Sequence, residues 1–177
     1  SVKADKAYAD VIKNLPADVN QIIQTGNAFN QRQLFKFSQQ TYLQGRKNLK
    51  GTYPFSFELA DAYAQDGKAT EMLNEYVDAI EFNDAYMPSV QTLLQSKIIN
   101  DLSGNLADQL RQVLLRKIQK NPNTSTFSEL LYWLFLQEKD FESAFIQAKA
   151  LDKRLGEDGD RLIVLGRACA SNGEYET

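Results

Sequence analysis

Few side chains in this chain of 177 residues could carry out chemistry, and histidine is absent. Histidine is the commonest general base and the commonest transition-metal ligand in proteins. Its absence excludes Ser–His and Cys–His nucleophilic pairs, and zinc sites built on imidazole, within this chain. The single cysteine, Cys169, excludes an internal disulfide. We predict a buried and unreactive thiol there, because reactivity needs exposure and a lowered pKa.

Two groups of carboxylates are candidates for acid–base or metal chemistry. Glu71, Glu75 and Asp78 lie three and four residues apart, so they share one helix face. On an amphipathic helix we expect that face to be solvated rather than catalytic. The run from Glu157 to Asp160 lacks the twelve-residue ligand spacing and closing Glu of a calcium loop. We therefore predict a solvated connection at 157–160, with no catalytic residue, metal site or cofactor in the chain.

The overall charge argues against nucleic acid as a partner. The net charge is −3, the isoelectric point is near 5.1, and the basic residues are scattered. Arg111, Arg116 and Lys117 form a local basic group, which we expect to be exposed. No apolar run approaches the roughly 20 residues needed to span a bilayer. Such a composition suits a soluble protein of the cytoplasm or of a bacterial periplasm, and the sequence does not decide between the two compartments.

The elements that position these residues are predicted to be helices. Apolar residues recur at helical spacing, as in Phe127, Leu130, Leu131 and Leu134, and no stretch alternates long enough to form a strand. Similar residues also return every 34 positions, which is typical of a helical hairpin repeated along the chain. Tyr8, Tyr42 and Tyr76 keep this period for two steps. The sequence predicts an all-α protein with short turns.

Aligned by their turns, the repeats begin near residues 19, 53, 90, 125 and 159. In the unit from 53, repeat positions 7, 8, 11, 15, 24 and 27 are occupied by Leu59, Ala60, Tyr63, Gly67, Tyr76 and Ala79. In the unit from 125, positions 7, 11, 17, 20 and 24 are occupied by Leu131, Phe135, Phe141, Ala144 and Ala148. This pattern of large, small and aromatic residues resembles the tetratricopeptide repeat (TPR) family, although the repeats are degenerate and Tyr132 stands where position 8 is usually small.

The resemblance implies a right-handed superhelical array of antiparallel helix pairs, a TPR-like solenoid forming a single domain over 1–177. Partial units at 1–18 and 159–177 would flank the units from about 19, 53, 90 and 125. Since an array end normally needs a polar cap, we expect the chain to belong to a longer array, or a partner to cover its C-terminal helix. The alternative is that the last helix is simply a poor cap.

In this family the exposed face of the first helix of each pair lines a concave groove. The matching positions here are rich in amides, which bond peptide N–H and C=O groups without requiring a particular charge. These binding candidates are Asn27, Asn30, Gln31, Asp61, Gln65, Glu129, Trp133, Gln137 and Arg167. Trp133 is either an exposed binding anchor or a residue packed on a neighbouring helix. The acidic Asp61 and Glu129 argue against a clamp for carboxylate tails.

The leading hypothesis is a non-enzymatic scaffold for protein–protein interaction that binds a protein or peptide segment in this groove. The first alternative is a structural or regulatory helical-repeat arm of a larger multidomain protein, with contacts through the last helix, 161–171. The weaker alternative is an enzyme whose groove accepts peptide or sugar; the missing histidine and the lack of a convergent carboxylate pair count against it. Reading of single-stranded RNA is disfavoured by the acidic charge.

Overall fold

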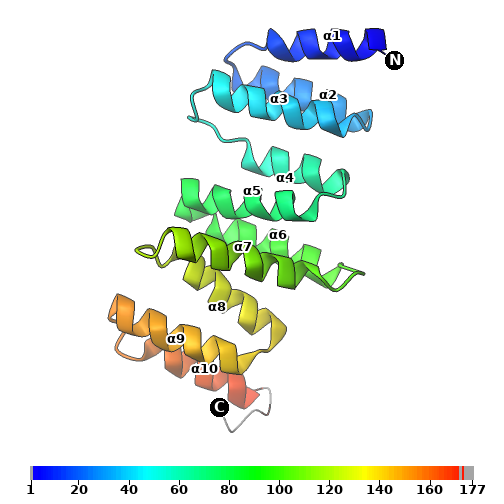
Figure 1. The fold of residues 1–177 in the computed structure, drawn as a ribbon. Helices are drawn as coiled ribbons and strands as arrows, with labels where there is room; N and C mark the ends of the chain where they lie inside the picture. Colours follow the sequence, from blue (N-terminus) through cyan, green and yellow to red (C-terminus); the bar gives the residue numbers. More distant parts are fainter. Residues whose placement is uncertain (1, 172, 174–177) are drawn as a thin grey trace. The chain divides into compact units, whose positions relative to one another are not determined.

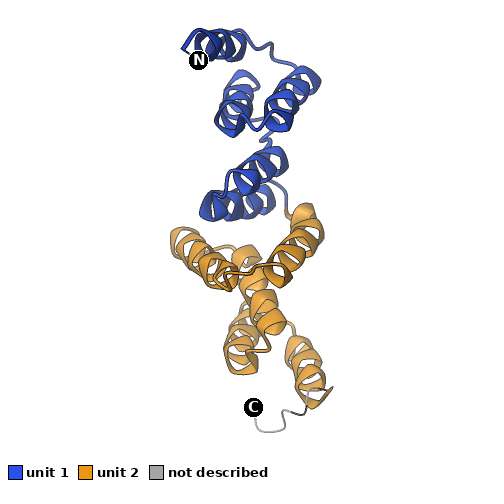
Figure 2. Ribbon diagram, turned by 90° about the vertical axis from the view of Figure 1, so that its right-hand side faces the viewer, with its two compact units in different colours: residues 1–83 blue, residues 84–177 orange. Residues whose placement is uncertain are grey.

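The computed structural model describes residues 2–171 and residue 173, and in this range the chain is all-α with no β-strand. This confirms the predicted all-α class. The chain divides into two compact units, residues 1–83 and 84–177 (Figure 2). The helices of the N-terminal unit are α1 (Val2–Lys13), α2 (Val19–Gln31), α3 (Phe35–Asn48), α4 (Ser56–Gln65) and α5 (Ala69–Phe82) (Figure 1). Those of the C-terminal unit are the short 3₁₀ helix η1 (Asp84–Tyr86), α6 (Met87–Ile99), α7 (Leu106–Lys120), α8 (Thr126–Glu138), α9 (Phe141–Leu155) and α10 (Asp160–Ser171).

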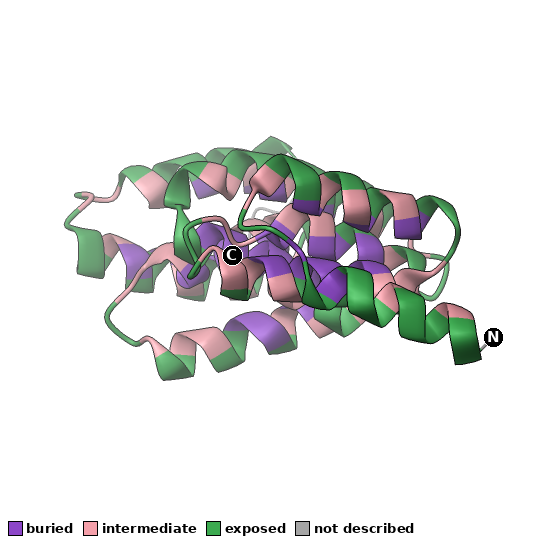
Figure 3. Cartoon of the chain, turned by 90° about the horizontal axis from the view of Figure 1, so that it is seen from above, coloured by how far each residue is buried: buried purple, intermediate pink, exposed green. Residues whose placement is uncertain are grey.

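The N-terminal unit contains two helical hairpins, α2 with α3 and α4 with α5. Only three residues separate the two helices of each pair, so the pairs are tight αα-hairpins. The turn after α4 contains Gly67 with φ of +71°, a left-handed conformation that glycine adopts without steric cost. The helix–turn–helix pattern predicted from the repeat is present here. The first helix, α1, packs on α3 and buries only Ile12 of its own residues. Most of this helix is exposed, as the green ribbon beside the N label in Figure 3 shows.

The α2–α3 hairpin is closely packed because two glycines face large side chains. A Cβ placed on Gly26 would lie 2.3 Å from Cζ of Tyr42, and one on Gly45 would lie 2.6 Å from Cγ2 of Ile22. Tyr42 and Ile22 are completely buried, with exposed fractions of 1% and 0%. The absence of a side chain at these two glycines lets the two helices of the pair approach closely.

Aromatic and aliphatic side chains form the core of the N-terminal unit. Tyr8 of α1 meets Phe29 of α2 and Phe37 of α3 edge-on, with ring centroids 5.3 and 5.2 Å apart. Phe55 lies in the connection between α3 and α4 and is fully buried. Its ring is tilted relative to that of Tyr42, with the two ring centroids 5.8 Å apart. Its backbone is left-handed, with φ of +51°, which costs about 1–2 kcal/mol in a non-glycine residue. Burial of its ring, about 1.5–3 kcal/mol, offsets that strain.

In the C-terminal unit, α8 is the most buried helix, and it packs against both α7 and α9. Its turn into α9 contains Lys139 in the left-handed conformation, followed by Asp140, whose carboxylate accepts a hydrogen bond from the Ser143 backbone N–H at 3.1 Å. Helix α10 packs on α9 and buries Leu165 and Cys169. The predicted burial of Cys169 is therefore confirmed.

Candidate functional site

Five of the binding candidates lie on α2 and α4 of the N-terminal unit. We call this set the α2–α4 face: Asn27, Asn30, Gln31, Asp61 and Gln65. Helical spacing places Asn27 and Gln31 one turn apart on α2, and Asp61 and Gln65 one turn apart on α4. All four are exposed. Asn30, between the two helices, is only 9% exposed.

Asp61 joins the two helices of this face. Its Oδ2 accepts a hydrogen bond from Nδ2 of Asn30 at 3.1 Å and another from Nε2 of Gln65 at 2.6 Å. Both donors are neutral amides. Within the part of the chain that the structure describes, no lysine or arginine forms an ion pair with Asp61. The structure thus brings together three of the five predicted residues around one carboxylate oxygen.

Tyr42, which was not among the predicted site residues, orients Asn27. Oη of Tyr42, on α3, donates a hydrogen bond to Oδ1 of Asn27 at 2.8 Å. Burial raises the pKa of Tyr42, and the charges of Glu58 and Asp61 raise it further. Burial also raises the pKa of Tyr76 to about 12, with a smaller contribution from Asp61. Both phenols are therefore protonated at neutral pH. The 34-residue tyrosine spacing was visible in the sequence, but not the pairing with Asn27.

Behind this face, polar contacts fix α3 against α4 and α5. The buried Gln39 donates through Nε2 to Asp66 at 2.9 Å and accepts from Nζ of Lys68 at 3.0 Å. Lys68 also pairs with Asp66 at 2.6 Å. Hydrogen bonds from Lys68 and Gln39 lower the pKa of the Asp66 carboxyl. The α2–α4 face consequently stands on helices whose relative position is set by directional bonds.

The prediction of a solvated carboxylate face on α5 is wrong at Glu75. This residue is buried at 7% exposure, and its carboxylate pairs with Arg46 of α3 at 2.7 Å. Burial raises the pKa of Glu75, while the Arg46 hydrogen bond and charge oppose that rise. Glu71 is exposed, as expected. The sequence pattern could not show this difference, because the cation that permits burial of Glu75 comes from another helix.

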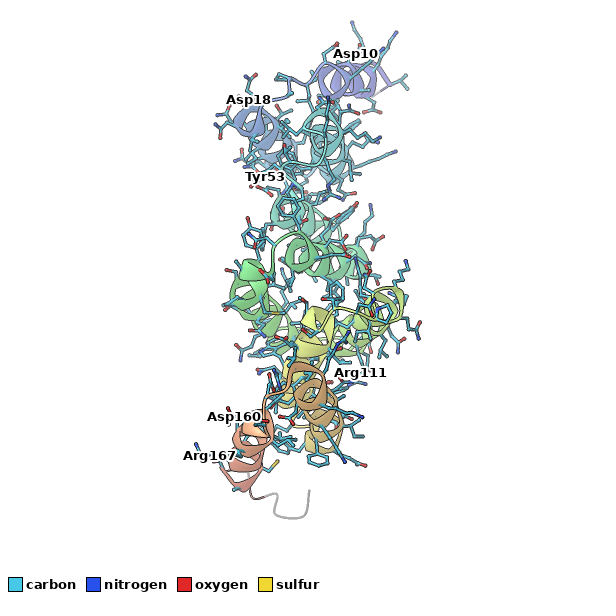
Figure 4. The ribbon with its side chains drawn as sticks, turned by 90° about the vertical axis from the view of Figure 1, so that its left-hand side faces the viewer. Asp10, Asp18, Tyr53, Arg111, Asp160 and Arg167 are labelled. Carbon is cyan, nitrogen blue, oxygen red and sulfur yellow. The ribbon has the colours of Figure 1, made fainter. Side chains whose placement is uncertain are left out.

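The remaining candidates belong to the C-terminal unit. Glu129, Trp133 and Gln137 share one face of α8, and Nε2 of Gln95 on α6 donates to Oε1 of Gln137 at 2.9 Å. Gln95 was not among the predicted residues. Glu129 and Trp133 are partly buried. Arg167 is exposed on α10 (Figure 4), and within the described part of the chain no hydrogen bond or ion pair joins it to the α8 residues.

The basic group on α7 is only partly exposed, whereas the sequence predicted that all three of its residues are exposed. Arg111, labelled in Figure 4, is partly buried and pairs with Glu138 of α8 at 2.8 Å. Its guanidinium lies over the ring of Phe135. Lys117 lies over the ring of Phe127. Arg116 is exposed, as predicted. The prediction is therefore wrong for Arg111 and Lys117, whose side chains tie α7 to α8.

The predicted solvated connection at 157–160 also contributes to packing. The partly buried Glu157 accepts hydrogen bonds from Arg161 of α10 at 2.5 and 2.7 Å, and these bonds lower the pKa of its carboxyl. Arg161 in turn lies over the ring of Tyr132. Glu157 therefore holds the start of α10, whereas Asp158 and Asp160 are exposed, as predicted.

The described residues offer no group of three His, Cys, Asp or Glu side chains able to hold a metal ion. Over the same part of the chain, no helix is both long enough and apolar enough to cross a membrane. The chain matches no protein-family model, and a comparison with curated proteins finds no similar protein. Inference about function therefore depends on the chemistry of the surface.

Proposed function

We propose that this protein is a non-enzymatic binding module that holds a peptide or protein segment against the α2–α4 face. The observation that carries the proposal is the Asn30–Asp61–Gln65 cluster, in which polar side chains from two helices meet around one carboxylate oxygen. A cluster with fixed geometry loses less side-chain entropy on binding than isolated polar residues do.

The chemistry of the face suits an extended polypeptide. Amide side chains both donate and accept hydrogen bonds, as backbone N–H and C=O groups require. Asn27, Gln31 and Gln65 supply three exposed amides on two neighbouring helices. In the C-terminal unit, the Gln95–Gln137 bond joins α6 to α8 in a similar way. Trp133, one turn from Gln137 on α8, is the proposed anchor there.

We place this module in a TPR-like architecture, with its helix pairs arranged as a right-handed superhelix. Support comes from the helix–turn–helix pairs at the predicted positions and from the glycine contacts at Gly26 and Gly45. In such an array the first helices of successive pairs lie side by side. The Asn30–Asp61 hydrogen bond joins two helices of that kind, α2 and α4.

Selection from a random library of 12-residue peptides tests the proposal. Individual enriched peptides are then measured by fluorescence anisotropy against the protein and its variants. Asn30→Ala and Gln65→Ala should each weaken binding about 2- to 10-fold, since a hydrogen bond contributes about 0.5–1.5 kcal/mol. Gln40→Ala, an exposed amide on α3, is the matched control and should change nothing. Failure to enrich any peptide, or equal effects of all three variants, contradicts the proposal.

Trp133→Ala provides a separate check on the C-terminal unit. The expected result is weaker binding of a partner with little change in melting temperature, because Trp133 is only partly buried. A large loss of stability with unchanged binding would instead assign Trp133 to the core.

The second candidate function, a structural or regulatory arm, is favoured by α10. Ile163 and Val164 on this helix are 55% and 59% exposed, although both are apolar. An arm of this kind would use α10 for contact with other parts of its assembly. Ile163→Lys should then abolish the association detected in a pull-down with the full-length protein, while Asn30→Ala leaves it intact. The opposite pattern favours the α2–α4 face.

A further inference from the structure

The hairpin of α4 and α5 carries an unbalanced charge. Residues 54–83 contain seven acidic residues and one basic residue. That basic residue, Lys68, pairs with Asp66, and Arg46 from α3 pairs with Glu75. Neither cation is paired with Asp61, whose exposed carboxylate accepts hydrogen bonds from the amides of Asn30 and Gln65. The negative charge on the α2–α4 face is therefore left without a cation from the described residues.

A second acceptor beside Asp61 also lacks a donor. Asn30 is 9% exposed, and its Oδ1 is buried with no hydrogen-bond partner among the described residues. Because Nδ2 of the same amide donates to Asp61, Oδ1 is held beside the carboxylate. A buried acceptor without a donor destabilises the folded state, because the acceptor has lost its hydrogen bonds to water. A bound group that brings donors to this position would remove that destabilisation.

The chemistry of the missing group follows from these two acceptors. It must bring several N–H donors and positive charge, which describes a lysine ammonium with three donors or an arginine guanidinium with five. A divalent metal ion fits poorly, because calcium takes six to eight oxygen ligands, and no cluster of metal-binding side chains is found in the described residues. A cationic side chain therefore satisfies this site best.

We propose that Asp61 is a specificity residue that receives a lysine or arginine side chain of the bound segment, with Asn30 and Gln65 as positioning residues. The proposal rests on the binding function proposed above and names the chemistry of its ligand. Two amide donors on Oδ2 fix the direction of the carboxylate, which leaves Oδ1 to meet the cation. Since Oδ1 of Asn30 is buried, a neighbouring side chain must turn aside for a donor to reach it as well.

The peptides enriched from the random 12-residue library provide the test. We expect lysine or arginine to be enriched at one position, and Asp61→Asn to weaken binding about tenfold or more at low salt. Asp10→Asn, which removes the same charge from an exposed site on α1, is the matched control and should have no comparable effect (Figure 4). Circular dichroism checks that both variants keep the helical fold.

A peptide with norleucine in place of the enriched basic residue completes the cycle. The norleucine peptide should bind the parent protein about tenfold more weakly than the basic peptide does. The Asp61→Asn variant should bind the two peptides equally well, because either change removes the same interaction. Asn30→Ala should weaken binding of the basic peptide and spare the norleucine peptide, which a purely structural role would not do. Peptides that bind without basic enrichment, or with equal effects of Asp61→Asn and Asp10→Asn, overturn the inference while the binding function stands. Recovery of no peptide overturns both.

Discussion

Replacement of Gly26 by alanine tests the closest helix–helix approach in the N-terminal unit. The new methyl group would lie 2.3 Å from Cζ, 2.6 Å from Cε1 and 2.6 Å from Oη of Tyr42. All three distances are far inside van der Waals contact. The ring cannot easily move, because Tyr42 is 1% exposed, lies near Phe55 and donates its hydroxyl to Asn27 at 2.8 Å. Either the ring or the α2 backbone must shift.

The expected magnitude follows from three contributions. Alanine in place of glycine stabilises a helix interior by about 1 kcal/mol. Overpacking of a filled core costs about 1–3 kcal/mol, and loss of the Tyr42–Asn27 hydrogen bond costs about 1 kcal/mol. Gly26→Ala should therefore lower the free energy of unfolding by about 1–3 kcal/mol. The shift of Tyr42 also removes the hydrogen bond that orients Asn27, which belongs to the α2–α4 face.

Gly166→Ala is the matched control, because Gly166 lies in α10 and its added Cβ would meet no atom within 4 Å. Only the helix-propensity gain applies there, so we expect this variant to be more stable by about 0.5–1 kcal/mol. Urea unfolding followed by circular dichroism at 222 nm measures both changes, and the fluorescence of Trp133 reports on the C-terminal unit. If Gly26→Ala stabilises the protein as much as Gly166→Ala does, the close α2–α3 packing is wrong.

Two further predictions concern the ion pairs that the structure revealed. Arg46→Ala leaves the buried Glu75 without its cation and should cost about 1–3 kcal/mol at pH 7. Burial raises the pKa of Glu75, so between its unfolded and folded pKa values the folded state binds more protons and stability falls as pH rises. Part of the stability lost in Arg46→Ala should therefore be recovered at pH 5, as measured by urea titration. An equal loss at pH 5 and pH 7 would refute this. Arg111→Ala should cost about 1 kcal/mol by removing the Glu138 pair and the contact with an aromatic ring. In thermal melts Arg111→Lys should recover only part of the lost stability, because lysine lacks the forked donors of arginine. The control Arg116→Ala should stay within about 0.5 kcal/mol of the parent. Similar losses for Arg111→Ala and Arg116→Ala would show that the α7–α8 ion pair contributes nothing to stability.

The sequence alone determined the helices and their order. Apolar spacing predicted an all-α chain, and the repeat pattern predicted units that begin near residues 19, 53, 90, 125 and 159, close to where α2, α4, α6, α8 and α10 begin. These features are local, since side chains three and four residues apart share a helix face whatever the rest of the fold does. The burial of Cys169 followed from the same periodicity. Groove positions such as Asn30 and Asp61 could also be named, but only as members of a repeat pattern.

The tertiary structure decided which polar side chains meet. Asn30 and Asp61 are 31 residues apart, as Arg46 and Glu75 are 29 apart, and no periodicity within one helix can pair them. Which polar side chains meet depends on the distance and rotation between neighbouring helices. Contacts such as that of Gly26 with Tyr42 set this arrangement. For this reason Glu75, predicted to be solvated from the pattern of its own helix, is buried against a cation, whereas Asp61 is exposed and has no ion-pair partner among the described residues.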